Sequence, residues 1–433
     1  MNAGLAVAGD CAFVGSRDGP GVAIVDVADP ARPQPAGELS AHAATSTREV
    51  RAVPTQHLLV VMDEGAFNGF DIYRWDIDCR HPVPLTAFDM GTRRPHEFYL
   101  WEDPAAPGRV LLFVAMFGAP GNALDVVDLS DPARPVAAGG WAYAASPLHS
   151  VDVTADGRTA YLSLWTGGLL VADVSDFTAG RPAPRMRLVT PAPVARPAPP
   201  GNVHSAVPVP GRALLVVTDE RFPPPYGPGC PYGSAAVYDV AQPAAPARLA
   251  SLGVHENAPG ACGEDPLAAW TSHNVTTTPN LALVSWYAAG LQVFDIADAA
   301  HPVVVAQVRP GAVTPSRRDP QLGPSPSLTW SYPVLSRGLV YVADINQGLL
   351  VYRYLGPHDD EVASAALVEG NSNATPAAAT SPAATTSPSG EPLAPPAVAE
   401  QGYGLSGAAI PLVAAAAVVL VVLLAGLSVA ARR

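Results

Sequence analysis

The sequence predicts an all-β fold, a seven-bladed β-propeller, and three observations lead to that prediction. Short apolar strands with strict alternation recur along the chain, and no helical periodicity precedes the C-terminal segment. The strands repeat as a unit every ~45 to 65 residues, a spacing typical of propeller blades. Seven copies of the unit therefore predict seven blades, the first without its innermost strand and the last without its outermost strand.

The repeat is clearest at residues 290–308, where an apolar strand leads into an Asp-rich turn, Pro302 and a second apolar strand. The turn aspartate recurs in six copies, as Asp26, Asp76, Asp128, Asp173, Asp239 and Asp295. We expect it to accept backbone N–H bonds between the third and fourth strands of each blade. Calcium binding is the alternative, and it is disfavoured because no copy has the glycine-spaced acidic loop of calcium sites.

The repeated motif, Leu/Val-x-Val-x-Asp-Val-x-Asp-Pro-x-x-Pro, is well preserved at residues 22–33. It resembles the bacterial LVIVD-repeat family, and the resemblance extends over about residues 4 to 355. It implies a propeller related to those of other cell-surface proteins, and it implies no particular reaction. We therefore assign residues 1–356 to one LVIVD-type propeller domain.

The composition excludes some classes of partner. The 433 residues are 48% apolar, enough for one large core, and the formal net charge is −13. Every basic residue is an arginine, and no cluster of them stands out. Binding to nucleic acid or to an anionic membrane surface through bulk electrostatics is therefore disfavoured.

The C-terminal part of the chain predicts a membrane anchor. Residues 407–431 carry no charge and are long enough for a transmembrane helix, and Arg432 and Arg433 follow them. By the positive-inside rule, the C-terminus would be cytoplasmic and the propeller extracytoplasmic. Residues 357–406 are rich in Ala, Pro, Ser and Thr and predict a disordered linker. Since Met1 opens no signal peptide, we expect a signal sequence upstream of it.

A second repeated signal lies at the start of the inner strands. Four consecutive copies place a histidine at one register: His96, His149, His204 and His273. Inner strands surround a propeller's axis, so these imidazoles would converge, and three or four of them suit copper, zinc or iron. Glu97 or Glu49 could add a ligand or act as a general base. The alternative is structural, with each histidine bonding to backbone or to a serine of the next blade.

The four cysteines divide into two pairs. Cys230 and Cys262 lie in loops of the same face, an insertion in the fifth copy and the connection to the sixth, and we expect a disulfide between them. Cys11 and Cys79 lie in or beside strands of neighbouring copies. For them, buried free thiols and a second disulfide both stay open.

Two functions fit these observations. The first is a membrane-anchored binding or scaffolding module whose partner is a protein, a glycan or a small molecule, recognised by aromatic loops that include Phe222, Tyr226, Tyr232 and Trp270. The alternative is a metal-dependent extracytoplasmic enzyme, an oxidase or hydrolase, with the histidines as ligands. No nucleophile elbow, P-loop or dinucleotide fingerprint is present in the sequence.

Overall fold

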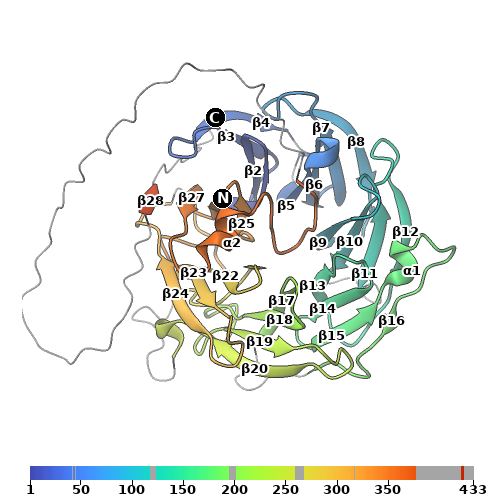
Figure 1. Ribbon diagram of the computed structural model, residues 1–433. Coiled ribbons are helices and arrows are strands. Elements are labelled where there is room, and N and C mark those ends of the chain that lie inside the picture. The colour runs from blue at the N-terminus through green and yellow to red at the C-terminus, as the bar shows by residue number, and fades with distance from the viewer. Residues whose placement is uncertain are drawn as a thin grey trace, which may run out of the picture.

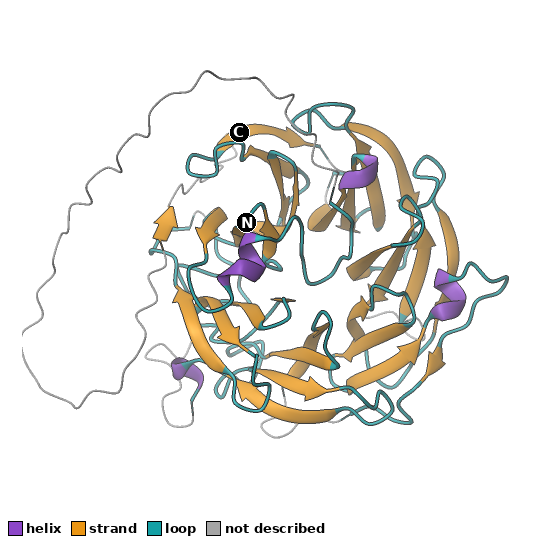
Figure 2. Ribbon diagram, in the orientation of Figure 1, coloured by secondary structure: helices purple, strands orange, loops and turns teal. Residues whose placement is uncertain are grey.

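The computed structural model describes residues 1–40, 42–43, 45–117, 123–194, 201–258, 268–315, 317–376 and 421–423. Its strands form antiparallel sheets arranged in a ring around a central axis (Figure 1). Figure 2 shows that strands dominate and that the helical turns lie at the edges and loops of the ring. The predicted all-β propeller is therefore confirmed.

Five sheets have four strands each, and in each the strands follow one another in sequence. Their bounds are β9 (Pro95–Glu102), β10 (Val110–Met116), β11 (Leu124–Asp128) and β12 (Val136–Trp141); β13 (Leu148–Val153), β14 (Thr159–Leu164), β15 (Gly168–Asp173) and β16 (Arg187–Leu188); β17 (Asn202–Pro208), β18 (Leu214–Glu220), β19 (Ala235–Asp239) and β20 (Ala247–Leu252); β21 (Val275–Thr277), β22 (Leu281–Trp286), β23 (Gly290–Asp295) and β24 (Val303–Val308); and β25 (Val334–Ser336), β26 (Leu339–Asp344), β27 (Gly348–Arg353) and β28 (Val421–Leu423).

The first two copies of the repeat share one eight-stranded sheet. Its strands are β1 (Asn2–Ala8), β2 (Cys11–Ser16), β3 (Val22–Asp26), β4 (Gln34–Leu39), β5 (Thr45–Val53), β6 (Leu58–Gly65), β7 (Gly69–Arg74) and β8 (Val83–Asp89). A single pairing, Ser16 with Thr47, joins β2 to β5. The prediction of seven separate blades is thus corrected to five separate blades and one wider sheet.

The inner strand expected to be absent from the first copy is present. Strand β1 pairs with β2 and packs against the last sheet, and the Asn2 N–H donates to the Ile345 carbonyl at 3.0 Å. Leu5, Val7 and Val14 share an apolar cluster with residues of β25 to β27. This cluster closes the ring, because it joins the first sheet to the last.

Apolar clusters fill the spaces between neighbouring sheets all around the ring. One cluster joins the β9–β12 and β13–β16 sheets through Phe113, Leu162 and Phe177, and another joins the β17–β20 and β21–β24 sheets. Inner and central strands are buried on both faces, whereas β4, β8, β12, β20 and β24 are largely exposed. Each large apolar side chain that is fully buried contributes about 1.5–3 kcal/mol, so the stability of the ring resides in these interfaces.

The turn aspartates occupy the last residue of the third strand. Asp26, Asp128, Asp173, Asp239 and Asp295 each accept the backbone N–H two residues further on, at 2.8 or 2.9 Å. Asp76 was misaligned by two residues, since the equivalent residue is Arg74 at the end of β7, just as Arg353 ends β27. Asp76 is 85% exposed and contacts Arg74 at 3.7 Å.

The short helices are η1 (Pro54–Gln56), α1 (Ser175–Thr178), η2 (His255–Asn257) and α2 (Asp359–Ala363). After α2, residues 364–376 form a segment that we call the C-terminal strap, and Glu369, Asn371 and Ser372 are buried in it. The strap pairs with Leu335 of the last sheet and then with Leu100 of β9. The linker prediction is therefore wrong for residues 357–376, and residues 377–406 lie outside the described residues.

The predicted transmembrane segment 407–431 also lies outside the described residues, except for β28, which pairs with β27. Within the described part of the chain, no helix is long and apolar enough to cross a membrane.

The Cys11–Cys79 pair, left open by the sequence, is a disulfide with a Cα–Cα separation of 6.0 Å. It links the first two copies of the repeat. Cys230 is also disulfide-bonded, whereas its predicted partner, Cys262, lies outside the described residues. The pairing of Cys230 with Cys262 stays a prediction.

Candidate functional site

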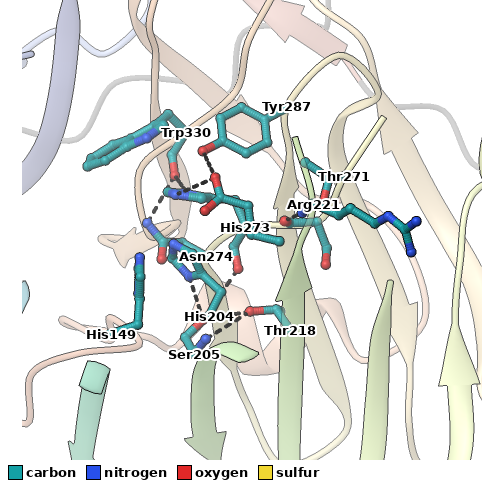
Figure 3. Close-up of polar contacts among 12 residues, drawn as sticks. His149, His204, Ser205, Thr218, Arg221, Thr271, His273, Asn274, Tyr287 and Trp330 are labelled. Atoms are coloured by element: carbon teal, nitrogen blue, oxygen red, sulfur yellow. Dashed lines mark hydrogen bonds and ion pairs between the residues drawn. The ribbon is translucent and has the colours of Figure 1, made fainter. Parts of the chain in front are cut away.

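The four histidines lie at the starts of four neighbouring inner strands. His96 is in β9, His149 in β13 and His204 in β17, and His273 comes two residues before β21. The equivalent positions elsewhere hold Arg48 and Glu49 in β5 and Trp330 before β25. Since inner strands are neighbours around the axis, the imidazoles come together there, and Figure 3 shows His149, His204 and His273 in one group.

The imidazoles form an unbroken row. The Nε2 atoms of His96 and His149 lie 3.0 Å apart. The ring centroids of His149 and His204 lie 4.1 Å apart, and those of His204 and His273 lie 4.0 Å apart. His149, His204 and His273 are at most 4% exposed, whereas His96 is half-buried at the end of the row.

Two carboxylates complete the cluster. Glu97 Oε1 lies 3.6 Å from His204 Nε2 and 4.0 Å from His149 Nδ1, and Glu220 Oε1 lies 3.9 Å from His273 Nε2. Two sets, Glu97 with His149 and His204, and Glu220 with His204 and His273, have ligand atoms within 4.8 Å of one another. Within the described part of the chain, His204 Nε2 is buried without a hydrogen-bond partner, as a nitrogen that binds a ligand would be.

Surrounding groups hold the cluster in place. The backbone carbonyl of Trp330 lies 2.7 Å from His273 Nδ1, so that nitrogen carries the proton and leaves the Nε2 lone pair free. The hydroxyl of Tyr332 donates to Glu97 Oε2 at 3.2 Å, and that of Tyr287 donates to Glu220 Oε1 at 2.5 Å. These bonds orient both carboxylates toward the histidines.

The serines beside the histidines join adjacent sheets. Ser150 Oγ donates to the His204 carbonyl at 2.6 Å. Ser205 Oγ, labelled in Figure 3, donates to the His273 carbonyl at 3.3 Å. The structural alternative is thus present in part: His273 Nδ1 bonds backbone of the next sheet, and His204 Nδ1 lies 3.4 Å from Ser205 Oγ. Among the described residues, His149 Nδ1 and His204 Nε2 are buried without a partner.

Burial controls protonation in the cluster. It lowers the pKa of all four imidazoles, with the positive charge of Arg48 contributing, and the pKa of His149 falls to about 3. Burial also raises the pKa of Glu97 well above its usual value and that of Glu220 to about 7. The imidazoles are therefore neutral near pH 7, which is the form that binds metals.

The sequence reasoning missed an aromatic wall beside the histidines. Phe117 comes directly after β10 and Trp165 directly after β14, the second strands of their sheets. Phe222 comes two residues after the end of β18, the second strand of the next sheet. The Trp165 ring stacks on His149 with centroids 4.8 Å apart, and Phe117 lies 4.8 Å from His96. An aromatic residue recurring just after the second strand was the available sequence signal.

The insertion loops expose fewer aromatic side chains to a partner than the sequence predicts. Tyr226 is exposed and Phe222 is half-buried, but Tyr232 and Trp270 belong to the apolar core between two sheets. The loop also contains residues 259–267, which lie outside the described residues. Of the aromatic residues predicted to recognise a partner, two are therefore structural.

The fold and the site together define a β-propeller with a buried histidine–carboxylate cluster on its axis. The LVIVD-repeat model matches residues 2–39 and 112–142, so the chain carries LVIVD repeats, and the resemblance noted in the sequence is confirmed. The search of curated proteins found no match.

Solved structures share the fold at low sequence identity. The periplasmic gluconolactonase PpgL of Pseudomonas aeruginosa is 17% identical, with 83% of this chain and 96% of that chain covered and a TM-score of 0.58. Sqt1 from Chaetomium thermophilum is 13% identical, with 81% of each chain covered and a TM-score of 0.50. At such identities, the likeness establishes the architecture alone.

Proposed function

We propose that this protein is a metal-dependent hydrolase whose metal ion is bound on the propeller axis by His149, His204 and Glu97. The observation that carries the proposal is two overlapping sets of buried ligand atoms, Glu97 with His149 and His204 and Glu220 with His204 and His273, together with a His204 Nε2 that has no hydrogen-bond partner among the described residues. Burying so many ionisable groups is costly unless something compensates for it. A divalent ion supplies that compensation.

The ligand set favours zinc, with copper or iron as alternatives. Two imidazoles and one carboxylate around an open position are a ligand set used by catalytic zinc sites. His96 Nε2 lies 3.0 Å from His149 Nε2, a hydrogen-bond distance, so His96 stays outside the two ligand sets and borders the site on its half-buried side.

Hydrolysis is the reaction that this arrangement supports best. A metal ion with an open position lowers the pKa of bound water to about 7 and so supplies a nucleophile at neutral pH. Glu220, held by the Tyr287 hydroxyl, is the carboxylate that we assign to proton transfer beside this centre. Because the similar fold of PpgL carries the name gluconolactonase, esters and lactones are the first substrates to test.

The test is the metal content of the full chain by elemental mass spectrometry, followed by hydrolysis of a lactone panel. We expect near-stoichiometric zinc, copper or iron in the parent protein, and a loss of affinity greater than ~100-fold in His204→Ala, since even outer partners of ligands contribute 10–100-fold. His301→Ala is the matched control, because that imidazole is 82% exposed. A folded parent protein that binds no metal would refute the proposal.

We also propose two features of the architecture, the number of blades and a membrane anchor. We infer that the eight-stranded sheet counts as two blades, because one pairing alone joins its halves.

Residues 407–431 are proposed to anchor the chain in a membrane with the propeller outside the cytoplasm. Membrane fractionation of the full chain and of a chain ending at residue 376 tests the anchor, which is refuted if both are recovered in the soluble fraction.

A further inference from the structure

An aromatic surface borders the histidine row on one side. The rings of Phe117, Trp165 and Phe222 come from three consecutive sheets and are each half-buried. The Phe117 and Trp165 centroids lie 5.7 Å apart, and those of Trp165 and Phe222 lie 6.2 Å apart. Neighbouring half-buried rings of this kind suit the planar apolar part of a ligand.

On another side, two guanidinium groups flank the same row. Arg48, in the strand next to β9, and Arg17, at the end of β2, each place Cζ 5.9 Å from the centre of the Trp330 ring. Trp330 itself lies 5.0 Å from His273, ring to ring. Arg48 contacts Glu64 at 3.6 Å, and Arg17 contacts Asp319. Glu49 and Glu220 also lie near enough to interact electrostatically with both guanidiniums.

Arg17, Arg48 and Trp330 each have one N–H group without an acceptor among the described residues. Arg17 Nη1, Arg48 Nε and Trp330 Nε1 are buried, and none of them meets a hydrogen-bond acceptor among the described residues. One unpaired buried donor is costly, and three around one aromatic ring are unusual. A carboxylate is the group that satisfies several such donors at once, because it accepts up to four hydrogen bonds.

From this juxtaposition of three unpaired donors, a histidine row and an aromatic wall, we infer that the substrate is an ester or lactone bearing a carboxylate and a planar apolar body. The inference rests on the proposed hydrolase function and adds the substrate class to it. The carboxylate binds Arg48, Arg17 and the Trp330 indole N–H, and the planar body lies against Trp165. The scissile carbonyl is then directed toward the histidines.

The test measures binding to the full chain by titration calorimetry with three probes: phenylacetate, its neutral isostere phenylacetamide, and acetate. We expect phenylacetate to bind about tenfold or more tightly than either of the others, because hydrogen bonds to a charged group are the strong ones. Arg48→Gln and Trp330→Phe should each remove most of that preference. Arg94→Gln is the matched control, since Arg94 also contacts Glu64 but is 65% exposed.

The outcomes separate this inference from the proposed function. Equal affinity for phenylacetate and phenylacetamide overturns the inference, and so does an unchanged preference in both Arg48→Gln and Trp330→Phe. Binding that is kept in those variants but lost on chelation places the carboxylate on the metal, which also overturns it. Metal content is measured on the same samples, so a metal-free protein that binds phenylacetate through Arg48 refutes the hydrolase and leaves the anion site standing.

Discussion

The four sheets from β9 to β24 and the rest of the ring are built from the same repeat, yet they differ at one position. The first group starts its inner strands with histidine, whereas the eight-stranded sheet has Arg48 and Glu49 there and the last sheet has Trp330. The sheets of both groups are antiparallel and pack against their neighbours through apolar clusters. The imidazole is therefore not a requirement of the blade, and its recurrence on one side of the axis needs another reason.

The two parts also differ in how they are held together. The part without histidines contains the Cys11–Cys79 disulfide and two third strands that end in arginine, Arg74 and Arg353. The part with histidines contains the disulfide-bonded Cys230, serine-to-carbonyl bonds between sheets and regular aspartate turns. We therefore propose a division in which the part with histidines holds the metal ion, and the following predictions examine that division.

The largest effect on stability at a single pH is expected for the disulfide. Replacing both Cys11 and Cys79 by serine removes a crosslink across 68 residues, which should lower the free energy of unfolding by about 4 kcal/mol. Denaturant unfolding with and without reductant measures the loss. If the division holds, the folded variant keeps its metal content, whereas simultaneous loss of the metal would show that the two parts are not separable.

A smaller effect is expected from the strap, which ties the last sheet to β9. The Asn373 amide donates to the Glu102 carbonyl at 3.0 Å and accepts from the Glu102 N–H at 2.8 Å. Asn373→Ala leaves both groups without a partner and should cost about 2 kcal/mol in urea unfolding. Ser364→Ala, at the exposed start of the strap, is the control and should change little.

A pH effect is expected in the eight-stranded sheet. Burial and the neighbouring Asp71 raise the pKa of the Asp63 carboxyl to about 8. The folded state then holds a proton that the unfolded state releases near pH 4, so stability is greatest at acid pH and falls as pH rises from about 4 to 8, by at most about 1.4 kcal/mol per unit.

Asp63→Asn should flatten this slope, as measured by unfolding at several pH values. Asp76→Asn, at a site that is 85% exposed, is the control. A parent protein whose stability rises over this range would contradict the prediction.

The smallest effect is expected in the turns. Asp239→Ala removes one acceptor of a backbone N–H and should cost about 1 kcal/mol, whereas Asp76→Ala should cost nothing measurable. Thermal unfolding of the two variants, compared side by side, checks the register correction. Equal losses of stability in the two variants would show that Asp76, and not Arg74, is the equivalent of the turn aspartate.

Much of this arrangement could be predicted because period-two alternation and turn aspartates are local signals. The register of the histidines followed from the same pattern, and propeller geometry then placed them around one axis. Asp76 was misassigned because β7 ends in Arg74, and an aspartate two residues away offered a false match. The eight-stranded sheet was not foreseen, since its halves are joined by the single Ser16–Thr47 pairing.

The remaining features depend on contacts that sequence spacing does not report. Glu220, Tyr287 and Trp330 lie far from one another in the chain and meet only because three sheets share an axis. The strap belongs to a stretch whose composition predicts a linker. It is held in a defined conformation by backbone hydrogen bonds to β9 and β25. Cys11 and Cys79 could be paired only once β2 and the turn after β7 were placed side by side.

The strap also determines how the domain responds to mechanical load. A pull on the chain beyond residue 376 reaches Thr375 and Asn373 first, and both are bonded to Glu102 in β9. The force therefore enters the ring at its third repeat, through the hydrogen bonds between the strap and Glu102. A protein tethered at its C-terminal side would in this way resist tension with the face that lies opposite its histidines.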